Sequence, residues 1–247
     1  MTTIKKGSKG DDVKIWQRFL AGKKYNITID GVFGPKTESA TKEYQKKNGY
    51  DITGIVGDTL WLVVDKLIPI VWGKRVTKPF INKVFEISNI LDVEPNWLMA
   101  CMAFESGKTF SPSIRNAAGS GATGLIQFMP QTAAALGTTT DKLSKMSAVS
   151  QLEYVLRYFE PSAGRLKNLE DVYMAILWPA GVGKSLNYVL FDKADVKYPK
   201  RYVQNAGLDI DRNGKVTKGE AANKVRQTLT AGFAEKEVLL INPDTWS

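Results

Sequence analysis

The stretch "PNWLMACMAFESG" at residues 95–107 decides the fold of the larger part of this chain. Pro95 suits the first turn of a helix and Gly107 suits the residue after its end, so we expect a helix over 95–106. From Trp97 to Phe104 its side chains are apolar, small or soft. A helix that is apolar on every side is usually buried. The pattern therefore predicts a buried helix that ends in one acid, Glu105.

The surroundings of Glu105 predict a raised pKa. Apolar neighbours such as Met102 and Phe104 remove water from the charged carboxylate, and the carbonyl end of the helix repels a negative charge. A raised pKa leaves part of the population protonated near neutral pH, as a general acid requires. The alternative is a surface glutamate at a fraying helix end.

Helical spacing of apolar residues continues along most of the chain. The expected helices, besides 95–106, are 10–21, 35–48, 58–67, 79–91, 130–136, 147–159, 169–177 and 218–232. No run alternates apolar and polar residues over six positions, so we expect little sheet. These patterns predict an all-α protein, with a small three-helix bundle followed by a larger helical domain.

The segment "KLIPIVWGKRVTK" at residues 66–78 interrupts the helical spacing with Pro69 and Gly73. We therefore expect one domain over 1–67, a short linker over 68–77 and a second domain over 78–247. A chain of 247 residues is long enough for two unequal domains that each bury a core.

Composition excludes several kinds of chemistry. The chain has no histidine, which removes Ser-His-Asp and Cys-His nucleophilic sites and the common His-containing zinc sites. Its single cysteine, Cys101, lies in the apolar run and forms no intramolecular disulfide. The net charge of +9 favours anionic polymers, but no basic arm or run of five like charges is present, so we expect no nucleic-acid partner.

Two similar turns mark the N-terminal region: "DGVFGPKT" at 30–37 and "TGIVGDTL" at 53–60. In each, glycines supply positive φ and Pro35 or Asp58 begins a helix. This order resembles the peptidoglycan-binding module of cell-wall hydrolases. The resemblance implies that peptidoglycan is the partner and that the wall-binding residues include Asp30, Gly31, Phe33 and Gly34. The alternative is a bundle in which these glycines have only a structural use.

A second glycine-rich stretch, "GATGLIQFMPQTA" at 121–133, follows the acid. Glycines let a polymer approach the backbone, and the Gln127 amide can donate to and accept from a sugar. With the preceding E-S-G, the pattern resembles the Slt-type lytic transglycosylases of the lysozyme-like superfamily, which modular phage endolysins carry. The resemblance implies that Glu105 is the catalytic acid, with Ser106 beside it, and that Gly124 and Gln127 bind the sugar.

A third family motif, usually A-Y-N-A-G-x-G, is present only loosely in "DVYMAILWPAGVGKS" at 171–185. Its asparagine is missing and Trp178-Pro179 stands there, which leaves the arrangement of sugar subsites open. Tyr173 resembles a tyrosine of the phage domains. We interpret Tyr173 and Trp178 as substrate-binding, although Tyr173 is equally consistent with a core ring.

The number of carboxylates bears on the reaction. Most glycosidases use two, roughly 5 to 9.5 Å apart, whereas no Asp or Glu lies between Glu105 and Gln127. The resemblance therefore implies non-hydrolytic cleavage of the β-1,4 MurNAc-GlcNAc bond, with Glu105 as acid and then base and a 1,6-anhydro-muramoyl product. The first alternative is a hydrolytic muramidase in which Glu153 or Glu160 assists. Others are a non-catalytic wall-binding or virion structural protein, and a calcium-responsive binding protein.

The segment "DIDRNGKVTKGE" at 209–220 fits the EF-hand calcium loop at every ligand position. Gly214 occupies the obligatory turn, and the predicted ligands are Asp209, Asp211, Asn213, the Lys215 carbonyl, Thr217 and Glu220. We expect a structural calcium ion and no cofactor for the chemistry. The alternative is a turn that keeps the loop shape without metal.

The N-terminus has no apolar segment of a secretory signal, and no run of about 18 apolar residues occurs. We therefore expect synthesis in a host cytoplasm, release by another factor, and action at the bacterial cell wall. We also expect no stable membrane insertion and a monomer.

Overall fold

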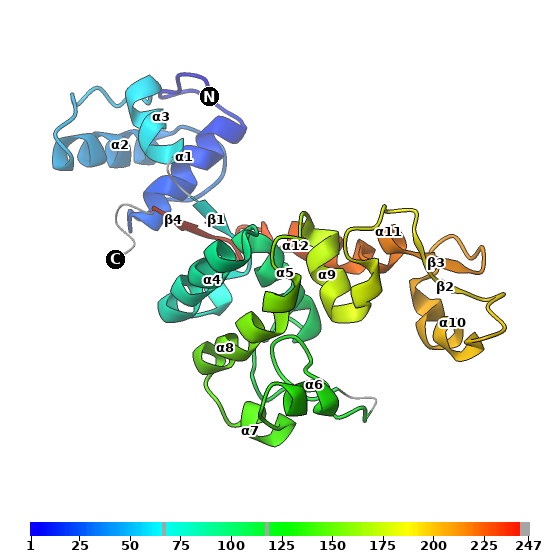
Figure 1. The fold of residues 1–247 in the computed structure, drawn as a ribbon. Helices are drawn as coiled ribbons and strands as arrows, with labels where there is room; N and C mark the ends of the chain where they lie inside the picture. The colour runs from blue at the N-terminus through cyan, green and yellow to red at the C-terminus, as the bar shows by residue number, and fades with distance from the viewer. Residues whose placement is uncertain (66–67, 117–118, 243–247) are drawn as a thin grey trace. The chain divides into compact units, whose positions relative to one another are not determined.

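A computed structural model describes residues 1–65, 68–116 and 119–242 of the chain. It separates into two compact units, one of Met1–Pro69 with Leu240–Ser247 and one of Ile70–Leu239. Figure 1 shows helices throughout both units. The described residues form four short strands. The predicted all-α class is confirmed, and no described helix is long and apolar enough to cross a membrane.

The first unit is built on three helices: α1 (Asp11–Gly22), α2 (Pro35–Lys47) and α3 (Asp58–Asp65). Their aromatic side chains make its core, in which Trp16 stacks on Phe19 with ring centroids 5.0 Å apart. The buried indole of Trp16 donates to Thr41 Oγ1 at 2.8 Å, so its polar group has a partner. The predicted helix end at 67, like the predicted boundary there, falls on residues 66–67, outside the described residues.

The segment 68–77, expected as a short linker, contains regular structure. Residues Ile68–Ile70 form strand β1, which pairs with β4 (Leu239–Ile241), and Gly73–Arg75 form the 3-10 turn η1. Ile70, Val71 and Trp72 are buried. Pro69 and Gly73 interrupt a helix here, as expected, but the apolar residues between them pack and make this segment part of the folded structure.

The second unit is centred on α5 (Pro95–Glu105), which packs against α4 (Lys78–Leu91), α9 (Leu169–Leu177) and α12 (Asn223–Gly232). Being apolar on every side, α5 is buried from Leu98 to Ala103. A second group of helices comprises α6 (Pro130–Ala135), α7 (Thr140–Ser144) and α8 (Ala148–Phe159), with α8 against α4.

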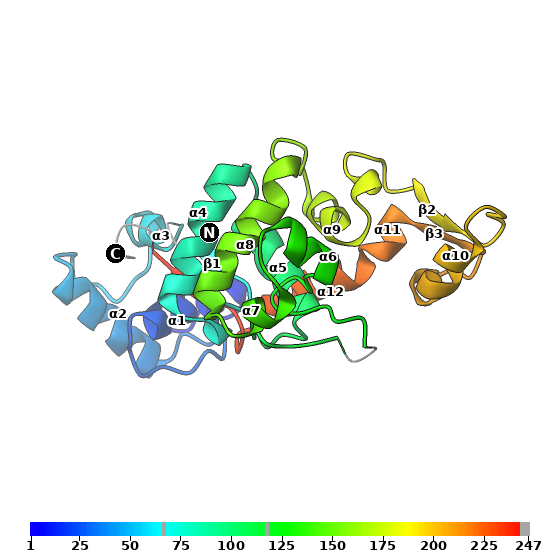
Figure 2. The same cartoon turned by 60° about the horizontal axis from the view of Figure 1, so that its bottom comes forward.

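The third part of this unit carries the two-stranded antiparallel sheet β2 (Val189–Asp192) and β3 (Lys215–Thr217), with α10 (Pro199–Asn205) against it. Figure 1 and Figure 2 both place this part on the far side of α9 from α6 and α7. The 3-10 turns η2 (Glu160–Ser162), η3 (Pro179–Gly181) and η4 (Ala206–Leu208) complete the described elements.

The helix expected over 218–232 is two helices, α11 (Lys218–Ala221) and α12. The two helices are separated at Ala222, where ψ is −7°. Thr217 and Glu220 form a reciprocal capping box at the start of α11, and this short helix leads directly from the 209–220 loop. Apolar spacing alone did not reveal the break.

Candidate active site

Glu105 is the last residue of α5 and lies at the edge of the buried core of the second unit. The residues before it, Met102 and Ala103, are fully buried, whereas Gly107 and Lys108 after it are exposed. The helix ends there because Gly107 adopts φ +59° and its amide bonds back to the Phe104 carbonyl at 3.2 Å. The carboxylate is therefore held at a boundary between core and solvent by a rigid element.

Burial raises the pKa of Glu105 to about 7 from its ordinary value of 4.5. Desolvation is the cause, because a carboxylate out of water favours its neutral form. No acidic side chain in the described ranges adds to this rise in pKa. At neutral pH the group is thus divided between acid and base forms, which suits a residue that must donate a proton and later accept one.

Two tyrosines lie close enough to Glu105 for its charge to affect their pKa values. Tyr173, on α9, is 4% exposed and packs edge-to-face on Phe104 with ring centroids 5.6 Å apart. Tyr158, on α8, donates its hydroxyl to the Ala175 carbonyl at 2.7 Å. Burial, followed by the negative charge of Glu105, raises the pKa of both phenols, so both stay protonated donors. Tyr173 has a feature of both expectations. Its ring is buried, as in a core residue, and it borders Glu105, as a substrate-binding residue would.

Ser106 makes its hydrogen bonds within the chain. Its side chain is fully buried, and its hydroxyl donates to the Met102 carbonyl at 2.6 Å and accepts from the Phe110 amide at 3.0 Å. The predicted substrate-binding role is therefore corrected. Because both hydrogen-bonding functions are used within the chain, Ser106 instead ties the end of α5 to the segment that follows it.

Gly124 and Gln127 belong to a tight loop between Thr123 and Phe128, whose backbones bond to each other at 2.9 and 3.0 Å. Gly124 is buried with φ +85°, and a Cβ there would overlap the side chain of Gln151. This packing by itself requires a glycine at 124, and its role in binding a sugar stays a prediction.

Gln127 remains half-buried in the same loop, with φ +53°. Its amide nitrogen donates to the Gly124 carbonyl at 3.1 Å. Among the described residues none donates to its amide oxygen. That oxygen is the group that Gln127 can offer to a ligand.

Gln151, which the sequence analysis missed, holds this loop in place. It is fully buried on α8, accepts from the Leu125 amide at 2.7 Å, and donates to the carbonyls of Pro112 and Leu143 at 3.0 and 2.9 Å. A signal was present, because Gln151 shares the buried helical stripe of Val155 and Phe159, where an amide is unusual. One side chain thus fixes the segments on both sides of the loop.

The third motif is held by a buried ion pair that spacing could not reveal. Asp171 and Lys218 are almost fully buried and pair directly. Asp171 also accepts from the Gly183 amide at 2.7 Å, and Lys218 donates to the Lys184 carbonyl at 2.8 Å. Since α9 carries Tyr173, this pair fixes the glycine turn at 181–183 relative to the helix that borders Glu105. Trp178 follows α9 directly and is half-buried.

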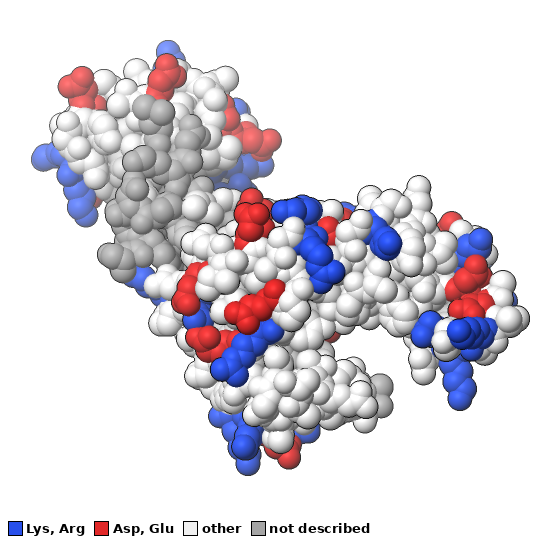
Figure 3. Space-filling view, viewed as in Figure 1, with Lys and Arg blue, Asp and Glu red and all other residues white. Residues whose placement is uncertain are grey.

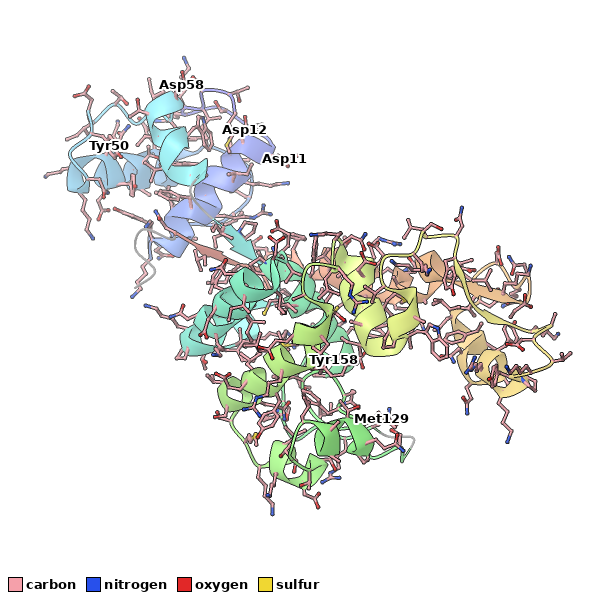
Figure 4. The ribbon with its side chains drawn as sticks, in the orientation of Figure 1. Asp11, Asp12, Tyr50, Asp58, Met129 and Tyr158 are labelled. Atoms are coloured by element: carbon pink, nitrogen blue, oxygen red, sulfur yellow. The ribbon has the colours of Figure 1, made fainter. Side chains whose placement is uncertain are left out.

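Figure 3 shows the second unit hollowed between the part that carries α6 and α7 and the part that carries α10. In Figure 4 Tyr158 and Met129 lie on this side of the unit, and Met129 is 46% exposed. The second unit therefore has a depression on the face where Tyr158 and Met129 lie.

In the first unit, the two predicted turns are built alike. The Gln17 amide accepts from the Gly31 amide at 2.8 Å and donates to the Val32 carbonyl at 3.0 Å. Gln45 does the same for the second turn, accepting from Gly54 at 2.8 Å and donating to Ile55 at 2.9 Å. The sequence analysis missed both glutamines, although each follows a core aromatic residue of a helix.

Of the predicted wall-binding residues, Asp30 and Gly34 line a pocket of about 200 Å³ beside the first turn. Gly31 is buried with φ +75°, and its amide is bonded to Gln17. Phe33 is 1% exposed and belongs to the core, so its predicted contact with the wall is corrected. The turn directs this ring into the core of the three-helix bundle.

The loop at 209–220 brings three of its predicted ligands together. Carboxylate oxygens of Asp209, Asp211 and Glu220 lie within 4.8 Å of one another. Gly214 turns the chain with φ +85°, as expected. Glu220 accepts from the Thr217 hydroxyl at 2.7 Å, so these two predicted ligands bond to each other. Asn213 bonds to Asp211 at 2.9 Å, and Lys215 begins β3.

Two known families match the chain. Residues 83–171 match the family described as Transglycosylase SLT domain, and residues 9–63 match the family described as Putative peptidoglycan binding domain. The first match contains Glu105 and Gln127 and ends at Asp171, before Tyr173. The second unit thus contains the domain of a lytic transglycosylase-type enzyme, which acts on peptidoglycan.

The match to a peptidoglycan-binding domain over 9–63 is followed by the match to an SLT transglycosylase domain over 83–171, and this order supports a modular endolysin. Among solved structures, the crystal structure of Burkholderia AP3 phage endolysin is similar at 18% sequence identity and a TM-score of 0.32. That match covers 94% of this chain and 99% of the other. A search of curated proteins finds no match to this chain.

Proposed function

We propose that this protein lyses bacterial cell wall by cleaving the β-1,4 MurNAc-GlcNAc bond without water, with Glu105 as acid and then as base. Glu105 protonates the glycosidic oxygen, and the bond from this oxygen to C1 breaks. The C6 hydroxyl of the same sugar then closes on C1 and returns its proton to Glu105. The product carries a 1,6-anhydro-muramoyl end.

The pKa of about 7 at Glu105 carries this proposal. A single carboxylate that changes between its two forms near neutral pH can serve both proton transfers. The neutral phenols of Tyr158 and Tyr173 lie near it, and Gln127 offers an amide oxygen to the N–H of an N-acetyl group. Glu153, considered as a second carboxylate, pairs with Lys83 at 2.5 Å and is exposed.

The substitution Glu105→Gln tests the role of this acid. We expect it to abolish the loss of turbidity of permeabilised cells while binding to isolated walls is unchanged. Glu153→Gln and Glu160→Gln are the matched controls, and they should retain lysis. Lysis by Glu105→Gln would show that another group is the acid, and absence of lysis by the unmodified protein would favour a binding or virion structural role.

Mass spectrometry of the digested wall tests the reaction type. We expect anhydro-muramoyl ends. Reducing ends that are one water heavier would instead identify a hydrolytic muramidase on the same fold.

Cleavage should decline above pH about 7, because Glu105 then loses the proton that the first step requires.

We also infer that the 209–220 loop binds calcium. The three clustered carboxylates support this, since calcium prefers oxygen ligands, and Glu220 would exchange its bond to Thr217 for the ion. Calcium at 100 times its Kd should stabilise the fold by about 2.7 kcal/mol. A melting temperature that rises with calcium relative to chelator, and no longer rises in Asp211→Ala, is the expected result. Asp195→Ala, outside the loop, is the control, and an unchanged melting temperature of the unmodified protein would contradict the inference.

A further inference from the structure

Three side chains form a stack on the α10 side of the second unit. The Arg201 guanidinium carbon lies 3.7 Å from the centroid of the Tyr198 ring and 4.9 Å from that of Trp178. Trp178 in turn packs edge-to-face on the buried Phe191, with centroids 5.2 Å apart. The arginine thus contacts two rings, and one of them, that of Trp178, is anchored on β2 through Phe191.

Arg201 has no carboxylate partner within the described ranges of the chain. Other arginines do have one: Arg75 pairs with Glu237 and Arg226 with Glu170. A guanidinium stacked on rings keeps its N–H donors in the plane of the group, pointing away from the ring faces. Arg201 is therefore oriented and charged, and its fork of donors suits a planar carboxylate.

The stack lies just beyond the end of α9, the helix that carries Tyr173. Trp178 follows the helix that carries Tyr173, five residues further on, which corresponds to roughly 7 to 8 Å of helix rise. The part that carries α10 also borders the hollow seen in Figure 3, where blue side chains gather on it. Lys197 adds a second cation, with its amine 5.3 Å from the Tyr198 centroid.

We propose that Trp178, Tyr198 and Arg201 form an outer subsite that binds a carboxylate of the peptidoglycan strand, from its lactyl or peptide groups. This inference rests on the proposed function, because it takes the strand bound at Glu105 as its ligand. The aromatic rings hold the guanidinium in position, and the anion pairs with its free edge. The subsite secures the strand at a distance from the bond that is cleaved.

A thermodynamic cycle tests this subsite directly. All variants carry Glu105→Gln, so that soluble peptidoglycan fragments of several disaccharides stay intact. Binding is measured by calorimetry for fragments with free carboxylates and for the same fragments with the carboxylates converted to amides. We expect Arg201→Ala to weaken binding of the free-carboxylate fragments roughly tenfold and that of the amidated fragments hardly at all.

The control is Arg157→Ala, since Arg157 also lies over a tyrosine, Tyr154, at 5.5 Å. It should change binding of the two kinds of fragment equally. Arg201→Lys keeps the charge and should give a smaller, still carboxylate-dependent loss, which covers the case in which the alanine variant misfolds. Equal losses for both kinds of fragment, or none, would overturn the subsite. Because the cycle measures binding, it decides this point even if the unmodified protein fails to cleave wall.

Discussion

Glu105 shows how the property of one residue follows from its neighbours. The apolar run before it identified a buried helix, and desolvation by the packed core raises its pKa to about 7. Its own backbone position is ordinary, at the C-terminal end of α5. The proposed chemistry therefore depends on the integrity of the surrounding core as much as on the acid.

The stability of the second unit should depend on pH through Glu105. Its pKa is higher in the folded protein than the ordinary 4.5, so the folded state binds more protons between pH 4.5 and 7. The free energy of unfolding contributed by this group therefore falls as pH rises through that range, by roughly 3 kcal/mol. Glu105→Gln stays neutral and should exceed the unmodified protein in stability at pH 8.5 but not at pH 4. Denaturant titrations measure this, with the exposed Glu94→Gln as a control that should show no such pH-dependent gain.

Gly124 allows a second test at the scale of one residue. Gly124→Ala must adopt φ +85° and also overlap Gln151, so we expect it to lower the free energy of unfolding by about 3 kcal/mol or more. Gly137→Ala is the matched control, because Gly137 has φ +75° and no atom near its Cβ position. It should cost only about 1 to 2 kcal/mol. Equal losses in chemical denaturation would mean that the Gln151 packing is unimportant.

At the scale of elements, single buried polar groups connect segments that are distant in the sequence. Gln151 on α8 fixes the loop that carries Gln127, and the Asp171–Lys218 pair fixes α9, the 181–183 turn and the start of α11. Such groups are costly to bury unless every donor and acceptor is used. Here backbone carbonyls and amides of irregular segments are the hydrogen-bond partners of these buried groups.

Breaking the buried pair should be far more harmful than replacing it. Lys218→Met leaves Asp171 charged and unpaired, at an expected cost of about 3 to 5 kcal/mol. The double variant with Asp171→Leu should recover part of this stability, although the Gly183 amide loses its acceptor. Lys167→Met is the control, because its pair with Asp92 is exposed and should contribute under about 1 kcal/mol. Equal losses in Lys218→Met and Lys167→Met, measured by thermal unfolding, would contradict this account.

At the scale of the whole molecule, the chain contains two units that each enclose a core. The buried cluster of the first unit runs from Ile4 to Val64, and all its members come from that unit. Cores that share no residues can unfold separately.

We therefore expect two transitions in calorimetry. Leu20→Ala, in the core of the first unit, should lower only one of them, by about 2 to 5 kcal/mol in free energy of unfolding. Leu152→Ala, equally buried in α8, should lower only the other. A joint shift of both transitions in either variant would show that the units unfold as one.

Much of the local structure was predictable from the sequence. Periodic apolar residues, with Pro35 and Pro95 in first turns, located the long helices within a few residues, and the glycine turns and the E-S-G and G-L-x-Q motifs located the candidate site. These signals are local, because a helix or a turn is specified by residues a few positions apart. The short strands β2 and β3 and the break at Ala222 lacked any such signal.

Burial and partnership were decided only by the tertiary structure. Phe33 and Ser106 belong to recognisable motifs, yet packing turns both inward, away from the ligands they were expected to contact. Gln151, Lys218 and Arg201 gain their roles from residues 26, 47 and 23 positions away, respectively. A motif determines which residues are present, but the exposure, pKa and partners of a side chain depend on which distant segments pack around it. That is why the sequence alone made Glu105 a candidate acid, and only the folded chain determined its surroundings.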